Sequence, residues 1–293
     1  MPDPTELVLT GAFATALVVF GVASGLRAWS GRGLDGASGN FETAVIPPSP
    51  VPGRVAVRSY QVPDLLGAAL VFLVFAGMVL ASFQMPEKPA GAPDKETLLI
   101  SIGFLFLMAG FVTAMASRRI EISSWLGLRW PAWPWVFLLA PASLLFMWLI
   151  LVGLKVTGYI EWMESLGVET TQETVKLLQQ SDDPRLLGLM AIAALIAAPL
   201  CEEIIFRGYL YPVMKKFGGM FPAAICSALV FAAAHGNLTA LLPLFIFGGV
   251  LVFLYEKTGS IWAPIAAHFC FNGCTVALQM AARYYQIPLG SLW

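Results

Sequence analysis

The sequence predicts an all-α protein, a polytopic bundle of about eight transmembrane helices. Hydrophobic residues make up 58% of the 293 residues and charged residues only 12%, and the mean hydropathy is +0.77. A soluble domain carries about 25% charged residues, and half that share cannot cover a surface that faces water. Several apolar stretches also reach the ~20 residues that one membrane span requires. This composition excludes a soluble enzyme and a disordered chain.

The first four spans follow from apolar runs that contain no charged residue. Asp3 and Glu6 precede the first run without any Lys or Arg, so we expect a retained helix rather than a cleaved signal peptide. Trp130, Trp133 and Trp135 open the fourth run as an aromatic belt at the membrane interface. The four runs are Leu7–Leu26, Leu65–Phe83, Thr97–Ala116 and Trp135–Leu154.

The last hundred residues are apolar as well, but polar residues interrupt them. We expect four further helices in this part of the chain, and their starts lie near Leu186, Phe221, Leu238 and Ile261. Together with the first four runs they give the predicted total of about eight spans.

Three regions are expected along the chain. Residues 1–60 hold an accessory first helix and a Gly/Pro-rich linker, Gly31–Gly53. Residues 61–185 hold helices two to four and an acidic loop, in which Thr170–Gln180 is expected to form a short helix at the membrane surface. Residues 186–293 hold helices five to eight, which carry the candidate site.

The charges between the spans predict the orientation. Lys and Arg gather after spans one, three and five, whereas the loop after span four is acidic. Because cytoplasmic loops are enriched in Lys and Arg, we expect the N-terminus outside and the protein in the plasma membrane if the organism is bacterial. The basic residues after the odd-numbered spans are Arg27, Arg32, Arg54, Arg58, Arg118, Arg119, Arg129, Lys215 and Lys216.

Two further classes are excluded by composition. The 17 Lys and Arg against 18 Asp and Glu leave no basic excess for nucleic acid. The four cysteines form no CxxC pair, which argues against a disulfide framework and a cysteine zinc site.

Ionisable residues occur in the last four predicted spans and not in the first four. Such residues are expensive in a membrane and mark candidate functional sites. Glu203 and Arg207 stand four apart on a helix, share a face and can neutralise each other. Glu202 points about 100° away and suits a general base, although both acids could instead share Arg207 as a packing contact. The candidate residues that these spans contain are Glu202, Glu203, Arg207, His235, His268 and Asn272.

Glu202, His235, and His268 with Asn272 lie on the fifth, sixth and eighth predicted helices at similar predicted depths, so they can meet. His268 and Asn272 stand four apart and project from one helical face. Hydrogen bonds between helices would explain any one of these groups alone. Together they suit amide hydrolysis: Glu202 with His235 would activate a water, and the other two would stabilise the oxyanion. Cys270 points to another face, so a covalent mechanism is disfavoured.

The motifs, in this order, resemble those of the CPBP family, also called the ABI family, of CAAX prenyl proteases and bacteriocin-processing proteins. The resemblance covers about Leu186–Leu278, and these relatives are intramembrane endopeptidases. It implies that Glu202 is the base, helped by His235, that His268 and Asn272 form the oxyanion site, and that Glu203 and Arg207 hold the site together. The motifs are Glu202-Glu203-x-x-x-Arg207, Phe231-x-x-x-His235 and His268-x-x-x-Asn272.

The resemblance leaves the cofactor and the substrate open. Family members are described both as metalloproteases and as glutamate-dependent proteases, and Glu202, His235 and His268 could supply a zinc site with an open position. The implied partner is a peptide or protein, prenylated or membrane-associated, in the lipid bilayer. The alternative is a non-catalytic immunity or scaffold protein that binds a peptide in the same cavity. A transporter is disfavoured because no inverted repeat is found. The oligomeric state stays open.

Overall fold

The computed structural model describes residues 3–30, 54–57, 60–84, 95–168, 178 and 181–286. Within these ranges every regular element is a helix, as predicted. The expected linker Gly31–Gly53 lies outside the described residues. So does the expected surface helix Thr170–Gln180, apart from Leu178.

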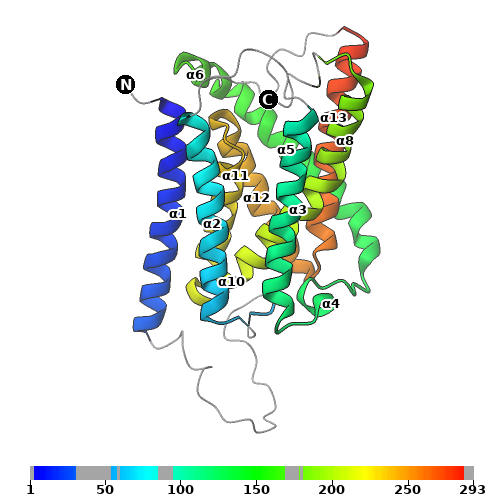
Figure 1. Cartoon of the computed structure of the whole chain (residues 1–293). Coiled ribbons are helices and arrows are strands. Elements are labelled where there is room, and N and C mark those ends of the chain that lie inside the picture. The colour runs from blue at the N-terminus through cyan, green and yellow to red at the C-terminus, as the bar shows by residue number, and fades with distance from the viewer. Residues whose placement is uncertain are drawn as a thin grey trace.

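The helices stand side by side as one bundle (Figure 1). In the part of the chain that the structure describes, seven helical stretches are long and apolar enough to cross a membrane, and Met220–Ala234 is a shorter apolar helix. The protein is therefore an integral, multi-pass membrane protein. The seven stretches are α1 (Pro4–Trp29), α2 (Val62–Gln84), α3 (Lys95–Ser117), Trp133–Val156 with α5 (Val136–Val156), Pro184–Gly218, α12 (Leu238–Thr258) and α13 (Trp262–Tyr284).

The short helix α11 (Met220–Ala234) has a consequence for the interior. Its 15 residues extend about 22 Å, which is less than the ~30 Å of the hydrocarbon core. The helix alone does not cross the hydrocarbon core, and the exposed His235 follows directly as its C-cap residue. Space for a cavity remains beyond this end.

The fifth stretch is not a regular α-helix. It passes from α8 (Pro184–Ile192) through two π-helical segments, η2 (Ala193–Ala197) and η3 (Glu203–Leu210), which flank α9 (Ala198–Glu202), and ends as α10 (Tyr211–Gly218). Such wide turns are rare and often lie at functional sites. Side chains from other elements bind the carbonyl groups of these two segments: the Asn272 amide donates to Ala194 O at 2.8 Å, and the Trp125 indole N–H donates to Gly208 O at 2.8 Å.

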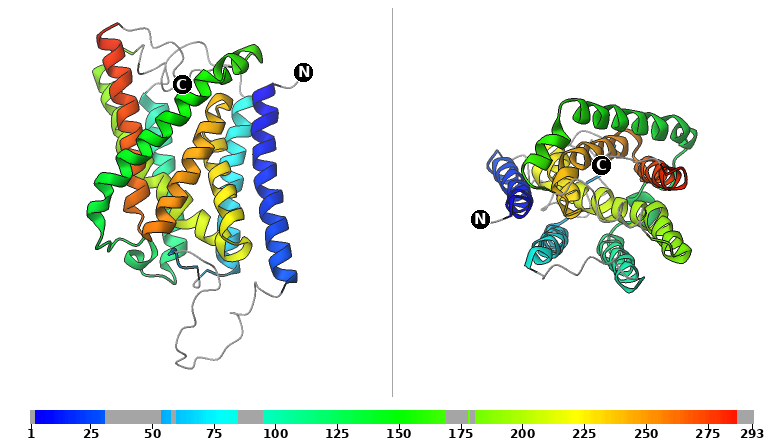
Figure 2. Two further views of the ribbon diagram at one scale, coloured as in Figure 1. Left: turned by 180° about the vertical axis from the view of Figure 1, so that it is seen from behind. Right: turned by 90° about the horizontal axis from the view of Figure 1, so that it is seen from above.

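The first helix packs against the bundle through one face. α1 contacts α11 and α10, and Leu9, Phe13 and Ala16 are buried. The Cys226 thiol of α11 lies 3.2 Å from the Ala16 carbonyl. Figure 2 shows α1 at the edge of the bundle in the view from above. The division into three regions stays a prediction.

The two ends of the bundle differ in charge. We call one the acidic end, where the short helix α6 (Tyr159–Ser165) lies, and the other the basic end, where the short helix α4 (Ile122–Trp125) and α10 lie (Figure 1). The acidic end carries Glu161, Glu164, Asp182 and Asp183, and the basic end carries Arg118, Arg119, Arg129 and Lys216.

Lys215, expected in a loop at the basic end, lies instead within α10 and is fully buried. Its ammonium group forms an ion pair with Glu256 of α12 and donates to Val55 O at 3.0 Å. The Tyr211 hydroxyl donates to the same Glu256 oxygen at 2.7 Å. A buried cation requires such partners, and here they fasten the segment around Val55 to the basic end.

Candidate active site

A buried ion pair forms the centre of the polar site. Glu203 and Arg207 both lie on η3, and Arg207 Nη1 donates to Glu203 Oε1 at 2.8 Å. Both side chains are 0% exposed. The predicted i,i+4 pair is therefore present, and each charge compensates the other where water cannot.

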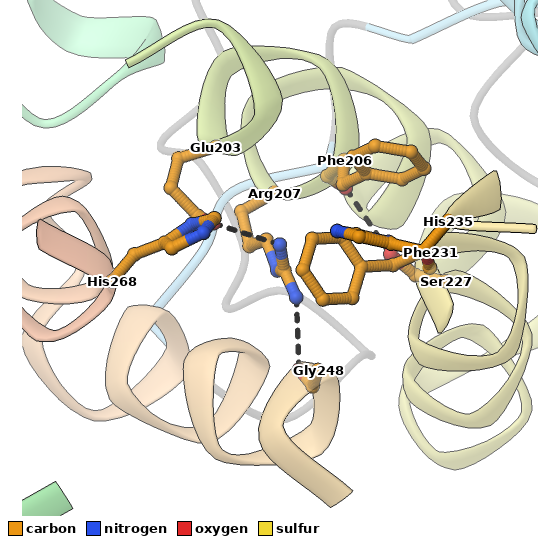
Figure 3. A network of polar contacts seen from close by, with 8 residues as sticks. All are labelled: Glu203, Phe206, Arg207, Ser227, Phe231, His235, Gly248 and His268. Atoms are coloured by element: carbon orange, nitrogen blue, oxygen red, sulfur yellow. Dashed lines mark hydrogen bonds and ion pairs between the residues drawn. The ribbon is translucent and has the colours of Figure 1, made fainter. Parts of the chain in front are cut away.

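The Arg207 guanidinium is also held by two neighbouring helices. Its carbon lies 4.3 Å from the centre of the Phe231 ring of α11, a distance suited to a cation–π contact. Its Nη2 donates to Gly248 O of α12 at 3.3 Å (Figure 3). A methyl group at Gly248 would lie 3.0 Å from Ala228, so glycine permits this close approach of α11 and α12.

His268 of α13 joins the same ion pair. Its Nδ1 lies 2.9 Å from Glu203 Oε1, and because a carboxylate only accepts hydrogen bonds, Nδ1 carries a proton. Figure 3 shows the imidazole reaching the carboxylate from the side opposite Phe231. Glu203 is thus shared by Arg207 and His268. In the alternative, Glu202 and Glu203 would both pair with Arg207. Among the described residues, the ion pair of Arg207 is with Glu203.

Glu202 faces a different environment from Glu203. It lines a cavity of about 350 Å³, and its Oε2 is buried without a hydrogen-bond partner among the described residues. An unpartnered buried carboxylate oxygen is unfavourable for stability, but it is available to a ligand or water.

His235 lies where α11 ends and lines the same cavity. Its Nδ1 is 2.8 Å from Phe231 O. A carbonyl oxygen only accepts, so Nδ1 is the protonated nitrogen and Nε2 of a neutral ring is left with a free lone pair. The hydrogen bond thereby fixes a tautomer that can take a proton from water.

Asn272 also lines the cavity, one helical turn from His268. Because one amide N–H donates to Ala194 O of η2, its side-chain orientation is fixed. The other N–H remains for a ligand. The structure therefore brings Glu202, His235, His268 and Asn272 to one cavity, from three separate helical stretches.

The sequence left open a metal site formed by Glu202, His235 and His268. A zinc ion needs three or four ligands within reach of one another. Among the described residues, no group of three or more His, Cys, Asp and Glu side chains is placed to hold an ion. A zinc-ligating histidine commonly donates its other ring nitrogen to a carboxylate, as His268 Nδ1 does to Glu203, and the zinc set of Glu202, His235 and His268 stays a prediction.

Sequence reasoning assigned no role to several residues that shape the site, Phe231 among them although it belongs to a quoted motif. Phe231 both supports Arg207 and accepts the hydrogen bond from His235, and Ser227 donates to Phe206 O at 3.2 Å. The spacing of Phe231 and His235, four residues apart, was visible as a motif. No signal in the sequence marks the π-helical segments or the role of Gly248.

Comparisons with known proteins agree with this location of the site. Residues 184–274 match the model of a family described as type II CAAX prenyl endopeptidase Rce1-like. The resemblance to CAAX proteases is confirmed for this segment. It contains every residue from Glu202 to Asn272 that meets at the cavity.

One curated relative extends the comparison. A protein of Bacillus subtilis (strain 168), named "Putative membrane peptidase YdiL", is 33% identical over 112 residues, which are 38% of this chain. The match covers 43% of YdiL, so the chain spans less than half the length of this relative. No solved structure matches the chain.

Proposed function

We propose that the protein is an intramembrane endopeptidase of the CAAX-protease and bacteriocin-processing type. The observation that carries this proposal is the convergence of Glu202, His235, His268 and Asn272 on one cavity within the bundle. The Rce1-like segment and the similarity to a protein named as a membrane peptidase support it. The substrate is a peptide segment of a membrane-associated protein.

The reaction begins with a water molecule between two proton acceptors. Glu202 has a carboxylate oxygen without a partner, and His235 has Nε2 left free by its bond to Phe231 O. As the water oxygen attacks the scissile carbonyl carbon, one of these groups takes the water proton. The same proton then passes to the leaving amide nitrogen when the C–N bond breaks.

The tetrahedral intermediate carries its charge on the former carbonyl oxygen. Asn272 offers its second amide N–H, and His268 offers Nε2–H when its ring is protonated. The Glu203 carboxylate binds His268 Nδ1 at 2.9 Å. Glu203 therefore acts through His268 as a positioning residue, and Arg207 keeps Glu203 in place.

The cavity walls suit a membrane substrate. Most lining side chains are aliphatic or aromatic, including Leu105, Met147, Leu244 and Phe271. Such walls accept apolar peptide side chains or a prenyl group, and they keep bulk water away from the donors, which strengthens their electrostatic effect. No step of this reaction uses a metal ion.

The direct test is a comparison of protein N-termini in membrane fractions. Cells that produce the wild type, Glu202→Gln or Glu96→Gln are compared by mass spectrometry. Glu96 is an exposed acid at the start of α3 and serves as the matched control. We expect the same new N-termini in wild type and Glu96→Gln, and uncleaved precursors in Glu202→Gln.

The non-catalytic alternative gives a different result. A binding protein would keep its cellular function in Glu202→Gln, because the amide is nearly isosteric with the carboxylate. If the wild type and Glu202→Gln cells contain the same uncleaved proteins and Glu202→Gln keeps the phenotype, hydrolysis is contradicted. That result would favour the immunity or scaffold function.

A further inference from the structure

The cavity lies in the half of the bundle that belongs to the acidic end. α3 begins at that end and contributes Leu98 and Leu105 from its first half, whereas α5 finishes there and contributes Met147 and Lys155 from its second half. α13 likewise contributes only residues from His268 onward. Because the helices alternate in direction, these positions all lie between the catalytic level and the acidic end.

The charge difference between the two ends of the bundle indicates which side of the membrane the cavity faces. Excess Lys and Arg marks the cytoplasmic side of a membrane protein. In the described residues, Arg118, Arg119 and Arg129 lie at the basic end, while Glu161 and Glu164 lie at the acidic end. The cavity therefore belongs to the half that faces away from the cytoplasm.

Lys155 lies at the C-terminal end of α5 and lines the cavity toward the acidic end. It is exposed and, apart from the two histidines, it is the one basic residue among the described residues that line the cavity. No salt bridge between described residues involves Lys155, whereas Lys95 pairs with Asp183 at 3.0 Å and Arg283 pairs with Asp182 at 2.7 Å.

The neighbours of Lys155 do not neutralise it. The Tyr159 hydroxyl donates to Thr239 O at 3.0 Å, and burial raises the pKa of Tyr159 to about 12, so this phenol is uncharged. At the same end of the bundle, the hydrogen bond from Lys95 is the main cause that lowers the pKa of Asp183, and this acid pairs with Lys95.

We propose that the substrate enters from the acidic, extracytoplasmic end as an extended peptide, with apolar side chains along the cavity and a carboxylate bound by Lys155. This inference rests on the proposed function and names its substrate class. The carboxylate can belong to an Asp or Glu side chain or to a C-terminus.

The dimensions of the cavity set the distance between the carboxylate and the bond that is cleaved. Met147 and Lys155 are eight residues apart on α5, or about 12 Å. Met190 and Glu202, which also line the cavity, are at most about 18 Å apart along their helical stretch, which includes the π-helical segment η2. An extended peptide advances about 3.3 Å per residue, so about four to five residues separate the carboxylate from the scissile bond.

The direction of entry is tested without any enzymatic activity. Lys155→Cys and Arg118→Cys are treated with a membrane-impermeant maleimide in intact cells and again after permeabilisation, with the wild type as the baseline for native cysteines. Both positions are exposed. We expect Lys155→Cys to react in intact cells and Arg118→Cys to react only after permeabilisation. The opposite pattern would overturn entry from the outer face.

The role of Lys155 is tested with a library of short peptides and purified protein. Mass spectrometry compares the cleavage sites of the wild type, Lys155→Arg and Lys155→Glu. We expect a carboxylate about four to five residues from the cleaved bond in wild type and Lys155→Arg, and an at least tenfold lower ratio of acidic to neutral substrates in Lys155→Glu. An unchanged ratio would overturn the assignment of Lys155.

The two experiments separate the failure of this inference from the failure of the proposed function. Cleavage that persists in Glu202→Gln, or no cleavage by the wild type, refutes the proposed function and the substrate class with it. The maleimide result still reports the direction of the cavity in that case. Cleavage that depends on Glu202 but ignores Lys155 refutes only the substrate class.

Discussion

Adjacent glutamates have different surroundings at this site. Glu203 is fully buried and bound through Oε1 by Arg207 and His268, while Glu202 faces the cavity and forms no ion pair with a described residue. Each of the two has one buried oxygen, Oε2, without a hydrogen-bond partner among the described residues. A carboxylate that is neutralised by a cation suits a structural role, and one that is free suits proton transfer. The i,i+4 spacing of Glu203 and Arg207 made this division predictable, because the contact is local.

Arg207→Leu should destabilise the protein strongly. The substitution leaves Glu203 as a buried charge without its cation, which costs about 3–5 kcal/mol. Thermal unfolding in detergent measures the effect, and Arg118→Leu, an exposed arginine, is the control. Equal melting temperatures for the two variants would show that the Glu203–Arg207 pair does not hold the bundle together.

At the scale of single elements, the irregular fifth stretch is held in place from outside. Asn272 binds η2, and Trp125 binds η3 through Gly208 O. The Trp125 indole also donates to the Tyr60 hydroxyl at 3.0 Å. The apolar run in this part of the sequence predicts a helix. The wide turns, however, depend on contacts with residues far along the chain, such as the hydrogen bond from Trp125 to Gly208 O. The contact between His268 and Glu203 was missed for the same reason.

Trp125→Phe should weaken η3 and lower the rate of cleavage. The change keeps an aromatic ring but removes the buried N–H. The Gly208 carbonyl then keeps only the Tyr60 hydroxyl as a donor, at 3.3 Å, and the loss of one hydrogen bond costs about 1 kcal/mol. Trp133→Phe removes a largely exposed indole and is the matched control. Melting temperature and cleavage rate are measured on both variants, and a Trp125→Phe protein that behaves like the control would contradict the role of this contact.

At the scale of the whole molecule, composition and apolar runs predicted most of the fold. The last four helices begin within two residues of the expected positions. In a membrane, an apolar run of this length has few structures open to it other than a helix. The burial of Lys215 was not predictable, since its partners Glu256 and Val55 come from distant parts of the chain. The local sequence shows the basic pair Lys215-Lys216, but it does not show that Glu256 pairs with Lys215.

Lys215→Met should therefore destabilise the bundle far more than Lys216→Met. Removing the buried ammonium leaves Glu256 without its cation, at a cost of about 3–5 kcal/mol, and releases the bond to Val55 O. Lys216 is partly exposed and is the neighbouring control. Denaturation in detergent compares the two variants, and similar stabilities would mean that the Lys215–Glu256 pair contributes little.

The most direct measurement is peptide cleavage by the purified protein in lipid vesicles, wild type against Glu202→Gln. Loss of a general base lowers a rate by about 10²–10⁴-fold, and we expect a loss of this size with an unchanged melting temperature, because the altered oxygen has no partner among the described residues. Cleavage by Glu202→Gln at the wild-type rate would contradict water activation at this cavity.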